Sequence, residues 1–280
     1  MRYSPSGTCT RASRAPDGDA RARPLLHCHF ESALRALAVT RPGELQRLRP
    51  AFESPSYARA TAAGRPSLLD QQVTRLTQGQ DIFTREVFAE VVRQLSAEMT
   101  SSGIGHVDLR VGVLMHRWPW IASLTDAIGV FRSALPGPDT LTVSFLGAVN
   151  LSKPHDVLDA VFGRVLEAAP SGGLAGLDIN MGPADLPALD RYLGTLHDLQ
   201  RGGLRISIHL GELFGTGFSR RVLSRIIPSR IGHGVLLLDD AATVELIREN
   251  GIFLDMCPVS NTRLGFWDWT GPAPAPQRGR

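Results

Sequence analysis

Short runs of apolar and β-branched residues alternate with longer amphipathic stretches along most of this 280-residue chain. Such alternation is typical of a parallel sheet whose strands are joined by crossover helices. The pattern predicts strands at residues 25–30, 106–113, 142–149, 174–179, 204–210, 230–235 and 252–257. Helices are predicted between them, at residues 84–99, 121–134, 156–168, 186–199, 219–227 and 241–249.

The natural closure of this pattern is a TIM-type (β/α) barrel, which is built from eight units. Seven strands are predicted here, so the eighth β/α unit is expected to be missing or incomplete. An open doubly wound sheet is the alternative, but that fold usually carries a glycine-rich phosphate loop after its first strand. No such loop follows His29. The long connection to the second strand is expected to contain further helices, at residues 35–37 and 68–76 among others.

A single domain over residues 25–265 is the simplest division of the chain, because 43% of the residues are apolar and can fill one large core. Residues 1–24 are rich in Arg, Ser, Ala and Gly, which predicts a disordered tail, with a transit peptide as the alternative. Residues 266–280 are proline-rich and are predicted to form an irregular tail.

The charge and cysteine content narrow the class of partner. The net charge is +3 with basic and acidic residues interspersed, so we do not expect nucleic acid to bind. No apolar run is long enough for a membrane span. Three cysteines without a CxxC pair suit a reducing compartment and exclude a structural zinc cluster built from cysteines. We expect a cytoplasmic protein, and the sequence does not predict its oligomeric state.

Four histidines fall on predicted strands. His27 and His29 are two residues apart on the first strand, so their side chains point to the same face. His209 ends the apolar run LRISIHL, and His233 lies between two glycines in RIGHG. Alone, the His27 and His29 pair is weak evidence for a site, because paired histidines also occur in ordinary cores or on surfaces, and a lone His233 would more often be a core residue. Four at the ends of three strands of one barrel predict a shared site, because a barrel gathers its catalytic side chains at that edge.

These residues lie in motifs that resemble the adenosine deaminase family of metal-dependent hydrolases, which are β/α barrels. The matching stretches are HCHFES at 27–32, VDLR at 107–110, GLDINMG at 176–182, HLGE at 209–212, RIGHG at 230–234 and DMCPVSN at 255–261. The pair HLGE and RIGHG is the most specific part. No HxE with PCxxC pattern of the polynucleotide deaminases occurs, which favours a small purine substrate.

The resemblance implies a role for each matching residue. His27, His29 and His209 would bind one zinc ion per chain, although iron or cobalt also suits such a nitrogen-rich site. Glu212 would protonate the purine ring, and His233 would orient and deprotonate a zinc-bound water, whose lowered pKa supplies hydroxide. Glu31 and Gly182 would contact the sugar and the purine edge. The implied reaction is hydrolytic deamination of adenosine or a related 6-aminopurine, with release of ammonia.

One family motif has no match. The family supplies its last metal ligand from an aspartate in a TDDP motif at the eighth strand, whereas TRLGFWDWTGPAPAPQRGR follows Asn261 here, and Asp268 is a poor substitute. We therefore expect a weakly active or inactive protein, or one of low stability alone. A catalytically inactive relative that binds a purine or serves regulation is the alternative, although a binder would need neither Glu212 nor His233.

Overall fold

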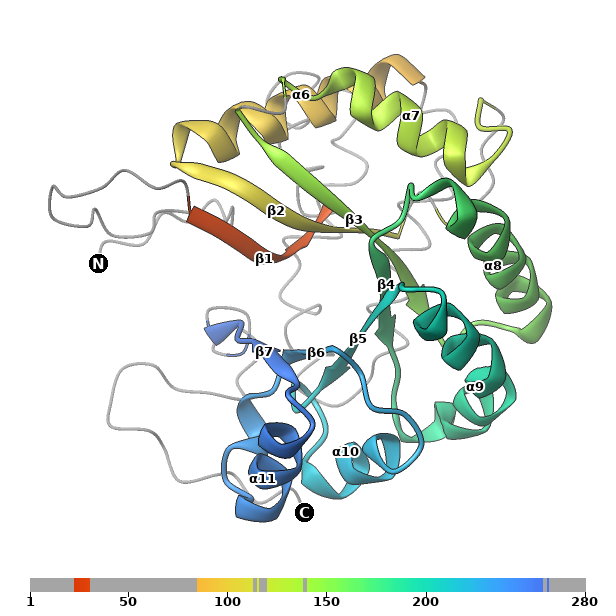
Figure 1. The fold of residues 1–280 in the computed structure, drawn as a ribbon, viewed down its shortest axis with the longest axis vertical. Coiled ribbons are helices and arrows are strands. Elements are labelled where there is room, and N and C mark those ends of the chain that lie inside the picture. The colour runs from red at the N-terminus through yellow and green to blue at the C-terminus, as the bar shows by residue number, and fades with distance from the viewer. Residues whose placement is uncertain are drawn as a thin grey trace, which may run out of the picture.

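A computed structural model describes residues 23–30, 85–112, 115, 120–137, 140–258 and 261. Within these ranges seven strands form one sheet in the order of the chain (Figure 1). The strands are β1 (Arg23–His29), β2 (Ile104–Val111), β3 (Thr142–Asn150), β4 (Gly176–Asn180), β5 (Arg205–Leu210), β6 (Arg230–His233) and β7 (Phe253–Asp255). The α-helices are α6 (Arg85–Ser101), α7 (Leu124–Ala134), α8 (His155–Ala168), α9 (Leu186–Arg201), α10 (Thr216–Leu223) and α11 (Ala241–Glu249).

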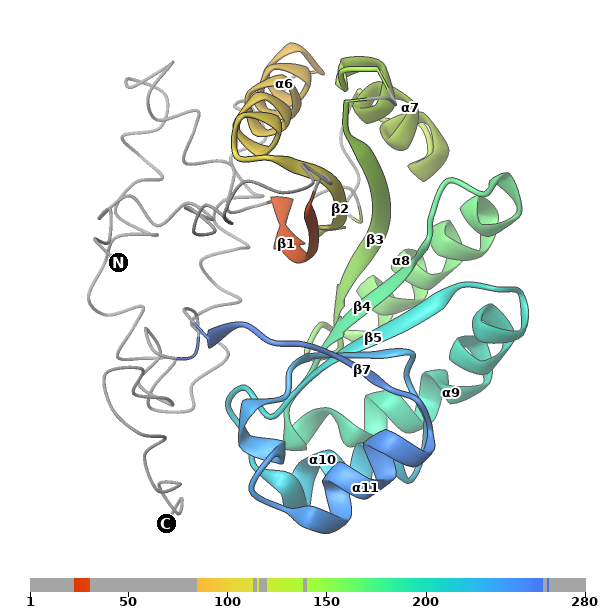
Figure 2. The same cartoon turned by 60° about the vertical axis from the view of Figure 1, so that its left-hand side comes forward.

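The sheet curves into a nearly closed barrel with the helices along its outer side (Figures 1 and 2). Every neighbouring pair of strands from β1 to β7 is parallel. The TIM-type architecture predicted from the alternation is therefore confirmed. Among the described residues β1 and β7 each pair on one side only. The missing eighth unit stays a prediction, because residues 262–280 lie outside the described ranges.

The two faces of the sheet differ in character, because apolar side chains face the helices and several polar side chains face the barrel interior. In β5, Ile206 and Ile208 are fully buried and alternate with polar side chains that face the barrel interior. Helix α9 turns Leu189 and Leu196 inward at helical spacing, and both are fully buried. The outward side of the sheet is thus sealed by the helices, which leaves the interior for polar groups.

A cluster of aromatic rings anchors the first strand. Phe30, just after β1, packs against Phe88 of α6 and Phe131 of α7, with ring centroids 5.2 and 5.7 Å away. Phe131 in turn meets Phe145 of β3 edge-to-face at 4.6 Å. Aromatic pairs at such distances add to the free energy of burial. They fix the end of the strand that carries His27 and His29.

Several element boundaries differ from the prediction, for local reasons. Helix α7 begins at Leu124 rather than at residue 121, because the Ser123 hydroxyl accepts a hydrogen bond from the Asp126 amide. Strand β6 stops at His233, since His233 and Gly234 both adopt positive φ. Strand β1 begins at Arg23, two residues inside the expected tail of residues 1–24, because Arg23 pairs with Ile104.

Three short 3-10 helices complete the described structure: η3 (Ala169–Ser171), η4 (Pro183–Asp185) and η5 (Val235–Leu237). None of the helices that the structure describes is long and apolar enough to cross a membrane. The helices predicted at residues 35–37 and 68–76 lie outside the described ranges, and the domain limits 25–265 and 266–280 stay predictions.

Candidate active site

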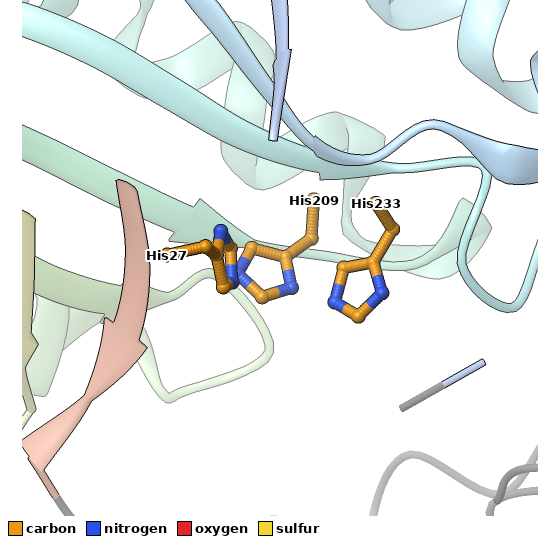
Figure 3. Close-up of side chains that lie close together, drawn as sticks. All are labelled: His27, His209 and His233. Atoms are coloured by element: carbon orange, nitrogen blue, oxygen red, sulfur yellow. The ribbon is translucent and has the colours of Figure 1, made fainter. Parts of the chain in front are cut away.

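Four imidazole rings meet inside the barrel at the carboxyl ends of three strands. His27 and His29 come from β1, His209 from β5 and His233 from β6. Figure 3 shows the rings of His27, His209 and His233 in the same small space. The centroid of His27 lies 5.1 Å from His29, 5.0 Å from His209 and 5.4 Å from His233. The convergence that the sequence predicts is therefore present.

The two histidines of β1 have only limited contact with acidic groups. Their Nε2 atoms lie 3.2 Å apart, and within the described part of the chain His27 Nδ1 lies 3.9 Å from Asp255 Oδ2. Burial lowers the pKa of His29 to about 3, helped by the charge of His209. Burial also lowers the pKa of His27 well below its usual value, helped by Arg110. Both rings are neutral, which is the form that binds a metal.

His209 differs because a carboxylate contacts each of its ring nitrogens. Nε2 lies 2.8 Å from Asp178 Oδ2, and Nδ1 lies 3.2 Å from Glu212 Oε2. Burial would lower the pKa of His209, but the charge of Asp178 and the bonds to both carboxylates raise it to about 10. In Glu212 burial raises the pKa, yet His233 and His209 outweigh this effect and lower it to about 2. The surroundings thus favour positive charge at the centre of the site.

His233 is held from two sides in an unusual backbone conformation. Its Nε2 lies 3.3 Å from Glu212 Oε1, and its Nδ1 donates to Asn261 Oδ1 at 3.0 Å. It is the one non-glycine residue with positive φ in the described part of the chain, with φ 70°. A non-glycine residue rarely adopts this conformation, and such strain collects at functional sites. The bond to Asn261 occupies Nδ1, so Nε2 is the nitrogen that faces Glu212.

The donor set fits a metal ion. Zinc binds imidazole nitrogen at about 2.0–2.1 Å, so ligand atoms around a tetrahedral ion are about 3.4 Å apart. The 3.2 Å between the Nε2 atoms of His27 and His29 is close to this spacing. Among the residues that the structure describes, two compact groups of three donors have their ligand atoms within 4.8 Å of one another: His27, His209 and His233, and His29, Asp178 and His209.

His209 belongs to both groups, whereas the predicted set of His27, His29 and His209 divides between them. Asp178 is the group that sequence reasoning missed. Its signal is an acidic residue inside the apolar strand GLDIN, because a buried charge needs a partner.

A small cleft beside Glu212 is lined by Asn180, Met181, Phe214 and Phe218 among others. Gly182 adjoins this cleft, and a Cβ placed on it would lie 3.2 Å from the Phe214 ring. The Gly182 amide donates to Asp185 Oδ2 at 2.7 Å, so it is not free for a ligand in this arrangement. In the sequence, Asp185 is the first acidic residue after Gly182. Glu31 lies outside the described residues.

Comparison with known proteins agrees with the geometry. The model of the family described as Adenosine deaminase matches residues 26–276, so the chain belongs to the adenosine deaminase family. It is 38% identical over 88 residues to an adenine deaminase of Mesorhizobium japonicum, a stretch that covers 31% of this chain and 27% of that protein. It is 22% identical over 244 residues to an adenosine deaminase of Clostridium perfringens, which covers 84% of this chain and 72% of that protein.

Solved structures support the same fold. The adenine deaminase of Arthrobacter aurescens superimposes with a TM-score of 0.63 at 19% identity, over 87% of this chain and 74% of that chain. The N6-mAMP deaminase of Arabidopsis superimposes with a TM-score of 0.62 at 16% identity, over 86% of this chain and 73% of that chain. An amidohydrolase from Burkholderia ambifaria with bound Zn superimposes with a TM-score of 0.59 at 15% identity, over 88% of this chain and 67% of that chain.

Proposed function

We propose that this chain catalyses the hydrolytic removal of the amino group from a 6-aminopurine, with water consumed and ammonia released. The observation that carries the proposal is the convergence of His27, His29, His209, Glu212 and His233 from three strands. Membership of the adenosine deaminase family supports this reaction type. Relatives act, by their names, on adenine, adenosine or a methylated AMP, so the substrate is sought among these.

One zinc ion per chain, held by His27, His29 and His209, is the proposed cofactor, and a structural neighbour contains bound Zn. When bound, such an ion acts as a Lewis acid and lowers the pKa of a water molecule that it holds. His209 contacts carboxylates through both nitrogens, so one contact must open when a metal binds. Loss of the proton from His209 accompanies that exchange, because a metal ligand must be neutral.

Proton transfer is assigned to His233 and Glu212. His233 takes a proton from the attacking water, and Glu212 gives a proton to the ring nitrogen beside the amino-bearing carbon. Their atoms Nε2 and Oε1 lie 3.3 Å apart, close enough for a proton to pass between them after a small movement. The carboxylate that receives the proton from His233 can therefore supply it to the ring. General acid help of this kind contributes about 10²- to 10⁴-fold in rate.

The cleft beside Glu212 is the proposed place for the purine. Phe214 and Phe218 form an edge-to-face pair with centroids 5.4 Å apart on one wall. Gly182 allows the Phe214 ring to approach closely, and its amide becomes available for the purine edge only if it releases Asp185. Glu31 keeps its proposed contact with the sugar.

The odd set of three cysteines supports a cytoplasmic location.

The test uses the full chain purified, stripped with a chelator and reloaded with zinc. Metal content is measured by mass spectrometry, and ammonia release is measured with adenine, adenosine and N6-methyl-AMP. The expected result is one zinc per chain and turnover of at least one of these compounds. Glu212→Gln should keep the zinc and lose about 10²-fold or more in rate. Bound zinc with no ammonia from any compound would favour a purine-binding protein, and absence of zinc after reloading would refute the metal site.

A further inference from the structure

The barrel interior contains a buried arginine that no proposed catalytic step uses. Arg110 of β2 is fully buried and is one of the largest side chains without solvent contact. Its Nε lies 3.2 Å from Asp178 Oδ1 and its Nη2 lies 2.9 Å from Asp255 Oδ2. Burial works against its charge, but the two carboxylates outweigh it and raise the pKa of Arg110. One guanidinium therefore joins acids from β4 and β7.

Each of these acids faces a different candidate ligand. The second oxygen of Asp178 lies 2.8 Å from His209 Nε2. Asp255 Oδ2, the oxygen that Arg110 contacts, is also 3.9 Å from His27 Nδ1. That nitrogen is buried and has no hydrogen-bond partner among the described residues. Asp255 is therefore the acceptor that His27 would use after a movement of about 1 Å.

We propose that Arg110 is a positioning residue that sets where His209 and His27 stand, by holding the carboxylates of Asp178 and Asp255 beside them. The proposal rests on the metal site of the proposed function. The planar fork of arginine suits this task, because it binds two carboxylates in fixed directions. Its Nη1 also donates to the Leu26 carbonyl oxygen at 2.7 Å, directly before His27. The same side chain thus ties β1 to β4 and β7.

The two sides of this arrangement are not equally dependent on Arg110. Asp255 is held by a second arginine, since Arg230 Nη1 lies 2.7 Å from its other oxygen. Asp178 has Arg110 as its one arginine partner among the described residues. Loss of the Arg110 fork should therefore disturb His209 more than His27. A purely structural role of Arg110 would not predict this order.

The test compares Arg110→Lys with Arg205→Lys in the full chain. Arg205 of β5 also contacts a buried carboxylate, that of Asp108, which faces none of the candidate ligands, so it serves as the control. Zinc affinity is measured by competition with a chromophoric chelator, and unfolding of the metal-free proteins is followed by circular dichroism. We expect Arg110→Lys to weaken zinc binding about 10- to 100-fold, as loss of groups that orient metal ligands does. Arg205→Lys should bind zinc as the unchanged chain does.

A second measurement reads the histidines without metal. In protein with 15N-labelled histidine, Arg110→Lys should shift the ring signals of His209 most and of His27 less, with those of His155 and His197 unchanged. If the protein without substitutions binds no zinc, the proposed function fails. The ring signals of the metal-free protein then test the positioning role of Arg110 by themselves. Unshifted signals of His209 and His27, or zinc affinity equal to the unchanged chain, would overturn it.

Should Arg110→Lys not fold, Asp178→Asn and Asp255→Asn replace it, because each keeps the side-chain shape and removes one charge. Asp178→Asn should shift the ring signals of His209, and Asp255→Asn those of His27. The opposite pattern, or the same shift of both rings in both variants, would overturn the proposal.

Discussion

The histidines of β1 and those of β5 and β6 occupy the same site in different ways. His27 and His29 lie on an edge strand of the described sheet, and their Nε2 atoms lie 3.2 Å apart. His209 and His233 lie on inner strands and are bonded to Asp178, Glu212 and Asn261. The inner pair is thus oriented by neighbouring side chains, although His209 must release one of its two carboxylates if it is to bind a metal. The outer pair supplies nitrogens whose pKa is lowered by burial, which favours the neutral form that a metal ligand needs.

The difference teaches how such a centre divides its tasks. Groups that move protons need fixed partners, because a small displacement changes the rate strongly. Groups that bind a cation need lone pairs free of competing protons, and burial provides this by lowering the pKa of His27 and His29. The two halves should therefore respond differently to substitution and to removal of the metal.

Replacing a proposed zinc ligand in either half should weaken zinc binding by more than about 100-fold. The reason is that losing a ligand costs more than losing a group that only orients a ligand. His29→Ala should do little else. His209→Ala should also lower the free energy of unfolding of the metal-free protein by about 1.5–3 kcal/mol, because Asp178 loses a charged hydrogen bond. Chelator competition and urea unfolding measure the two effects. Equal destabilisation by both variants would contradict the division into halves.

Removal of the metal should loosen the outer half selectively. Zinc at about 100 times its dissociation constant stabilises the folded state by about 2.7 kcal/mol. Hydrogen exchange of the amides of β1 should slow on zinc binding by more than that of β5, because β1 has one paired neighbour in the described sheet and β5 has two. The comparison is made on the same sample before and after chelation. Equal slowing in both strands would show that β1 is already fixed without metal.

Much of the barrel could be predicted from the sequence, because apolar runs and amphipathic stretches follow the periods of strands and helices. The convergence of His27, His29, His209 and His233 was also predictable, since parallel strands of a barrel present their carboxyl ends at one rim. Both inferences need local pattern and a rule of topology. Neither needs the register of the strands.

The partners of these histidines could not be predicted in that way. Asp178 contacts His209 and Arg110 only through the register of β2, β4 and β5, which no local pattern encodes. The positive φ of His233 arises from the turn into η5, and the flanking glycines are its one trace in the sequence. The sequence does predict that a charged residue inside an apolar run has a buried partner. Which partner it has depends on three-dimensional structure.

Gly232 lies between the two halves and offers a steric test. A Cβ at this position would lie 2.7 Å from His27 Cε1 and 3.3 Å from His209 Cδ2. Gly232→Ala should therefore displace the His27 ring, weaken zinc binding and destabilise the fold by about 1–3 kcal/mol. Gly163→Ala in α8 is the control, because a Cβ there meets nothing within 4 Å. It should leave zinc affinity unchanged and stabilise the helix by up to about 1 kcal/mol. Zinc binding by Gly232→Ala at full strength would show that His27 is not a ligand.

The smallest effect is expected for the bond that orients His233. Asn261→Ala removes the acceptor of His233 Nδ1, whose distance is 3.0 Å, and leaves the three candidate zinc ligands untouched. One hydrogen bond contributes about 0.5–1.5 kcal/mol, so kcat should fall between about twofold and tenfold while zinc affinity stays the same. Asn250→Ala at the end of α11 is the matched control, since its side chain donates to the Leu246 carbonyl oxygen and contacts none of the candidate site residues that the structure describes. A fall in zinc affinity with kcat unchanged would place His233 among the metal ligands and reverse the roles of the inner pair.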